Sequence, residues 1–66
     1  GAAKEAALTF VRRKRFGPFG AQPPDMAARK RQIHSIARAG HGFQIAIALV
    51  DAKSEEEAER LVYEDE

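Results

Sequence analysis

Three prolines fall within residues 16–24, and they restrict this chain more than any other feature of its sequence. Pro18 has no backbone N–H to donate, and its ring pushes Gly17 away from the helical region. Phe16 and Phe19 flank this Gly-Pro pair, whereas a disordered linker seldom carries two aromatic residues so close together. We therefore expect one helix to end before Gly17, a packed loop to follow, and a second helix to begin after Pro24.

The residues on either side of this loop are typical of helices. Alanines and a helical spacing of apolar residues predict a first helix over residues 2–15. Asp25 is a suitable N-cap for a second helix over residues 26–39. We expect this second helix to face the core through an apolar stripe of Met26, Ile33, Ile36 and Ala37.

The C-terminal part of the chain predicts two more helices. Gly40 is typical of a helix C-terminus, and the apolar run after it predicts a third helix over about residues 43–51, which should be the most buried of the helices. Ser54 and Glu57 form a capping-box signature for a fourth helix. The fourth helix should face inward through Ala58, Leu61 and Val62. The expected fold class is all-α, a single small three-helix module (helix-turn-helix-like) with an additional C-terminal acidic helix.

Charge is distributed unevenly along the chain. Residues 1–40 carry nine basic side chains against two acidic ones, a balance of +7, while residues 41–66 carry two against eight, a balance of −6. The formal net charge of +1 at pH 7 conceals this asymmetry. A dipolar molecule of this kind meets charged partners with one face, although the same pattern also fits a simply solvated helical domain.

The chain is short, and this limits both its core and its context. With 66 residues and no cysteine, it relies on a small core without disulfides or a thiolate metal site. Because the sequence lacks an initial Met and begins and ends within apparent helices, we expect a fragment of a longer protein. No apolar segment approaches the roughly 18 residues of a membrane span, and no signal peptide is recognisable. We therefore expect a cytoplasmic location and no membrane partner.

Residues that could support catalysis are few. There is no cysteine nucleophile, and Ser35 beside His34 is a poor nucleophile–base pair because neighbours on a helix point apart. His34, His41 and Asp51 match no metal-ligand spacing. The segment after Gly17 lacks the lysine and the hydroxyl of a phosphate-binding loop. We expect no enzymatic activity, no metal and no cofactor.

A DNA-binding module is a more serious alternative. The second and third helices have the outline of a helix-turn-helix, but recognition helices place Arg, Lys, Asn or Gln toward base edges. Gln44 is the one polar residue between Phe43 and Val50, so the third helix suits a core. The basic residues on the first two helices could hold phosphates without reading sequence. A non-specific DNA-binding helical module acting through a basic face therefore remains open.

Residues 7–19, which read ALTFVRRKRFGPF, are similar to the signature of the RecX family. In that family an alanine-rich helix and an arginine cluster precede Gly-Pro-Phe. Residues 29–40 resemble the basic helix and glycine turn that follow, and residues 43–50 resemble the short apolar helix at the end of a RecX repeat. The likeness spans roughly residues 5–50.

The chain also departs from the RecX pattern. Ala39 and His41 stand where the family usually has a second basic residue and an aromatic one, and Ile47 and Ala48 stand where it tends to keep arginines. These departures weaken any contact carried by the third helix and leave the packing pattern intact.

The resemblance implies a bacterial regulator of recombination and DNA repair, linked to the SOS response, that binds the RecA nucleoprotein filament and inhibits its activity. The chain resembles the C-terminal three-helix repeat of such a protein. The implied contacts to the filament or the single-stranded DNA backbone are Arg12, Arg13, Lys14, Arg15, Arg29, Lys30, Arg31 and Arg38. The implied structural loop is Phe16, Gly17, Pro18 and Phe19. We expect the fragment to be monomeric.

Overall fold

The computed structural model describes residues 1–64, and within them the chain forms four α-helices and one short 3-10 helix. The elements are α1 (Ala2–Lys14), η1 (Gly17–Phe19), α2 (Met26–Arg38), α3 (Phe43–Asp51) and α4 (Glu55–Tyr63). No strand occurs in this range, so the predicted all-α class is confirmed. Asp65 and Glu66, two of the eight acidic residues counted above, lie outside the described residues.

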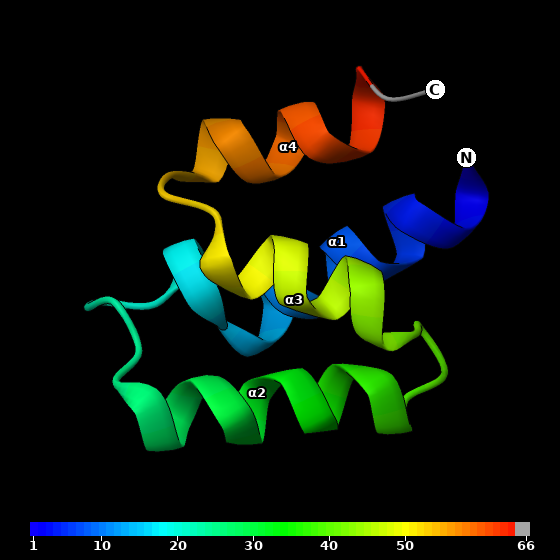
Figure 1. Ribbon diagram of the computed structural model, residues 1–66. Coiled ribbons are helices and arrows are strands. Elements are labelled where there is room, and N and C mark those ends of the chain that lie inside the picture. Colours follow the sequence, from blue (N-terminus) through cyan, green and yellow to red (C-terminus); the bar gives the residue numbers. More distant parts are fainter. Residues whose placement is uncertain (65–66) are drawn as a thin grey trace.

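The helices pack around α3 (Figure 1). α2 runs antiparallel to α3 along one side of it, and α4 lies on the other side. α1 crosses behind α3 and contacts all three of the other α-helices. None of the helices in residues 1–64 is long and apolar enough to cross a membrane.

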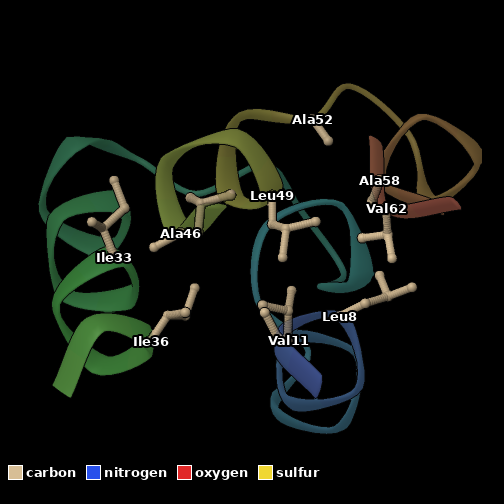
Figure 2. Packing of buried hydrophobic residues seen from close by; sticks show 11 residues of the cluster. Leu8, Val11, Ile33, Ile36, Ala46, Leu49, Ala52, Ala58 and Val62 are labelled. Carbon is tan, nitrogen blue, oxygen red and sulfur yellow. The ribbon is translucent and has the colours of Figure 1, made fainter. Parts of the chain in front are cut away.

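One core joins all four helices (Figure 2). Its largest fully buried side chains come from every helix: Leu8, Val11, Ile36, Leu49 and Val62. α4 contributes Ala58 as well as Val62 to this cluster, while Leu61 is only half-buried at its edge. The C-terminal acidic helix is therefore an integral part of the core.

Local capping residues set where the helices begin, as their sequence predicts. The Ala28 N–H donates to Oδ1 of Asp25 at 2.8 Å at the start of α2. The Glu57 N–H donates to Oγ of Ser54 at 3.0 Å at the start of α4. Both predicted N-caps are confirmed, because each side chain satisfies an amide that the helix leaves without a partner.

One expectation about burial is wrong and one holds. Met26, placed on the apolar stripe of the second helix, is 88% exposed. α3 is the most buried helix of residues 1–64, with three of its nine residues buried, yet Phe43 is 57% exposed and Ile47 is 41% exposed. Phe43 and Ile47 are four residues apart and share one side of α3, where α2 borders them but leaves both partly exposed.

Candidate functional site

The turn after α1 has an uncommon backbone. Arg15, the C-cap of α1, has φ 60° and ψ 45°, a left-handed conformation that residues with a side chain seldom adopt. The Phe16 N–H donates back to the Val11 carbonyl at 3.0 Å and closes the helix. The chain therefore turns sharply at Arg15, whose side chain remains exposed.

Gly17 attaches this turn to two other helices. Its N–H donates to Oε1 of Gln32 in α2 at 2.8 Å. A Cβ at this position would lie 2.9 Å from the Leu49 carbonyl oxygen and from Cα of Val50, both in α3. Gly17 also has a positive φ of 56°, so the position suits glycine alone.

The aromatic residues of the loop pack against the core. Phe16 and Phe19 are both half-buried, as is Pro18 in η1. The Phe16 ring meets the Phe10 ring edge-on, with 6.1 Å between their centres, and Phe10 in turn lies 5.4 Å from the His41 ring. The loop is therefore a packed segment that holds the end of α1 in place.

Two cations near the end of α1 contact neighbouring side chains. Arg12 donates from Nη2 to Oε2 of Glu59 in α4 at 3.0 Å, and its guanidinium carbon lies 5.6 Å from the Phe19 ring centre. Lys14 Nζ lies 5.8 Å from the Phe10 ring centre. Arg12 is the residue through which the basic end of α1 meets acidic α4.

Arg29 in α2 forms a two-pronged ion pair with Asp51, the last residue of α3. Its Nε donates to Oδ1 at 2.7 Å and its Nη2 donates to Oδ2 at 2.8 Å. These hydrogen bonds lower the pKa of Asp51, and the carboxylate raises the pKa of Arg29. Both side chains remain 45% exposed, so solvent screens the pair.

Five of the eight predicted contact residues have no ion pair or ring contact with residues 1–64. We call them the free cations: Arg13, Arg15, Lys30, Arg31 and Arg38. All five are exposed, and Arg31 and Arg38 lie two turns apart on one side of α2. Exposed guanidinium and ammonium groups of this kind bind phosphates or carboxylates.

The fold separates the free cations of α2, which are Lys30, Arg31 and Arg38, from the acidic residues of α4. α2 and acidic α4 lie on opposite sides of α3 (Figure 1). The charge imbalance along the sequence therefore persists between α2 and α4, whereas α1 meets α4 through the Arg12–Glu59 pair.

Some features of the site have only a weak signal in the sequence. The Gln32 side chain accepts a hydrogen bond from the Gly17 N–H, but no pattern around Gln32 in the sequence indicates this bond. In the sequence, Asp51 is considered only as a metal ligand and its spacing excludes that role, whereas the structure pairs it with Arg29. The two histidines each lie against a phenylalanine ring, and no three His, Cys, Asp or Glu side chains gather as metal ligands within residues 1–64.

Comparison with known proteins gives one informative match. No family model and no solved structure matches the chain. It is 42% identical over 50 residues to the regulatory protein RecX of Myxococcus xanthus, a match that covers 74% of this chain and 27% of the relative. The chain thus spans about a quarter of that relative's length. The arginine-rich segment before Gly-Pro-Phe indicates the RecX family, and the identity and coverage of this match show that the chain belongs to the RecX family.

Proposed function

We propose that this chain is a module of a regulator that binds the RecA nucleoprotein filament and lowers its activity. The observation that carries the proposal is the set of free cations, which projects from α1 and α2 without acidic partners in residues 1–64. The relative is a protein named for regulation, which supports regulation as the role of this chain. The module acts by binding alone, in the bacterial cytoplasm, and needs no cofactor.

The packed loop supports a binding role for these cations. Gly17 connects the turn to α2 and α3, and Phe16 packs on Phe10, so the end of α1 is fixed before any partner arrives. A fixed backbone reduces the ordering entropy that association costs. We propose the loop residues Phe16, Gly17, Pro18 and Phe19 as this support rather than as contacts.

A filament-binding assay with a salt series tests the proposal. Affinity would be measured by fluorescence anisotropy for labelled single-stranded DNA alone and for the same DNA coated with RecA. We expect tighter binding to the filament, with part of the affinity remaining at high salt, because apolar and hydrogen-bonded contacts are screened less than charges.

Two sets of variants define the residues responsible. Replacing Arg13, Arg15 and Arg31 with Ala should weaken filament binding and lower inhibition of RecA ATP hydrolysis. Arg60→Ala is the matched control, since Arg60 is an exposed arginine of α4 without an ion pair in residues 1–64. Equal affinities for naked DNA and for the filament, with equal salt slopes, would favour the alternative of a non-specific DNA-binding module.

A further inference from the structure

A groove of about 350 Å³ lies between α2 and α3. Buried Ile33 forms part of its floor, and Met26, Phe43 and Ile47 line it with large apolar side chains. These last three are 88%, 57% and 41% exposed, although an isolated small domain gains by burying such residues. They are three of the four large apolar side chains exposed in residues 1–64, and they gather at one place.

The rim of this groove is basic. Lys30 and His34 line it from α2, together with Arg29, whose charge is already paired with Asp51. No carboxylate lines the groove itself. Lys30 has no acidic partner within residues 1–64, so it remains available to an acidic group that approaches the apolar floor.

The lining favours a protein segment over a nucleobase. Single-stranded nucleic acids stack successive bases on several aromatic rings. This groove has one such ring, Phe43, and the edge-on His34 ring lies 5.9 Å from its centre. The other apolar lining residues are the aliphatic Met26, Ile33 and Ile47, which are suited to apolar side chains of a helix or strand.

We propose that this groove binds a protein segment that carries a large apolar side chain flanked by carboxylates. The inference rests on the proposed function, because it assigns that segment to the protein component of the filament. Charge complementarity with Lys30 selects the acidic flank, and the apolar floor selects the side chain between the carboxylates. The module then has two surfaces, the groove for protein and the arginines at the end of α1 for phosphate.

The test is the double variant Met26→Ala with Phe43→Ala. Both residues are exposed at the first turns of their helices, so the variant should keep its fold by circular dichroism. We expect its affinity for the RecA-coated DNA to fall at least about tenfold, as for aromatic residues at the centre of an interface. Its affinity for naked single-stranded DNA should stay within about twofold of the wild type, because apolar contacts release no counterions.

Two further variants complete the design. Tyr63→Ala removes an apolar side chain of similar exposure, 54%, from α4 and should leave filament binding unchanged. Lys30→Glu leaves the apolar floor intact and should weaken filament binding through repulsion of the acidic flank.

The outcomes separate the two proposals. A wild-type chain that does not prefer the filament overturns the proposed function and the groove's assignment with it. A wild type that prefers the filament while the double variant binds equally well overturns the groove alone. Loss of naked-DNA binding in the double variant would show that the groove holds nucleic acid. Self-association that the double variant abolishes, with filament binding intact, would show that the occupant is a second copy of this chain.

Discussion

Gly17 occupies a position where both backbone angle and space exclude a side chain. Its φ of 56° strains any other residue by about 1–2 kcal/mol, and a Cβ 2.9 Å from α3 backbone atoms adds overpacking of about 1–3 kcal/mol. We expect Gly17→Ala to lower the free energy of unfolding by the sum of these two effects, measured by urea denaturation.

Gly40 provides the matched control for that substitution. It also has a positive φ, 100°, but a Cβ there would meet no atom within 4 Å. Gly40→Ala should therefore lower the free energy of unfolding only by the backbone strain it introduces, about 1–2 kcal/mol. Equal losses at the two glycines would mean that the contact of Gly17 with α3 is unimportant for stability.

Arg15 keeps a left-handed conformation that glycine would adopt more easily, and its charge is unpaired within residues 1–64. Arg15→Gly should raise the free energy of unfolding by about 0.5 kcal/mol, since it relieves strain of about 1–2 kcal/mol and adds backbone entropy to the unfolded chain. The same variant should bind single-stranded DNA with a salt slope smaller by about 0.7, because one phosphate contact is lost.

Arg13→Gly separates the two effects of that change. It removes the same charge from the same cluster, but Arg13 lies within α1, where glycine costs about 1 kcal/mol of helix stability. Both variants should lose DNA affinity while their thermal midpoints move in opposite directions. A decrease in stability for Arg15→Gly would contradict the claim that its conformation is strained.

At the scale of elements, the Arg29–Asp51 pair connects the start of α2 to the end of α3 and makes stability depend on pH. The pKa of Asp51 is lowered in the folded state, so its contribution is present above the unfolded pKa of about 3.9 and is lost as pH falls through the folded value. The thermal midpoint of the wild type relative to Asp51→Asn should be constant between about pH 7 and 5 and decrease below about pH 4.

The effect should be small, because both side chains of the pair are 45% exposed. Arg29→Gln is the control, since it removes the partner that lowers the pKa of Asp51. If the wild type and Arg29→Gln lose stability in parallel on acidification, the pair does not contribute.

The helices could be predicted from sequence because their signals are local. Asp25 and Ser54 cap their helices through bonds to residues three positions away. The end of α1 before Gly17 also agrees with the sequence, although the helix ends at the left-handed Arg15, three residues before Pro18. The exposure of Met26 and Phe43 could not be predicted in this way. An apolar residue is buried only where another element covers its side of the helix, and that depends on how the helices pack.

The same reasoning applies to the candidate site. The basic residues and the Gly-Pro-Phe loop stand out in the sequence, and the structure divides the cations into paired and free ones. Arg12 and Arg29 pair with carboxylates that lie 47 and 22 residues away along the chain, and no local sequence pattern indicates such distant partners. Tertiary contacts therefore determine which basic side chains are already paired with a carboxylate and which remain available to a binding partner.

At the scale of the whole molecule, α4 combines a core role with an electrostatic one. Its Ala58 and Val62 are fully buried against the other helices, while Glu59 reaches across to Arg12. The acidic helix occupies one of the arginines directly, and we expect its overall field to oppose the approach of phosphate to the end of α1.

Glu59→Gln distinguishes these two effects of α4. It removes the carboxylate that holds Arg12, whose side chain is already 47% exposed, and so frees this arginine for phosphate. We expect tighter binding to single-stranded DNA and a salt slope that grows by about 0.7, the value for one more phosphate contact.

Glu55→Gln is the matched control, because it removes one negative charge from the same helix and Glu55 has no ion pair within residues 1–64. It should raise DNA affinity slightly through the long-range field and leave the salt slope unchanged, since no further cation reaches a phosphate. If both variants increase affinity equally and neither changes the slope, α4 acts on nucleic acid only through its overall charge. Only a larger slope for Glu59→Gln would assign α4 direct competition for Arg12.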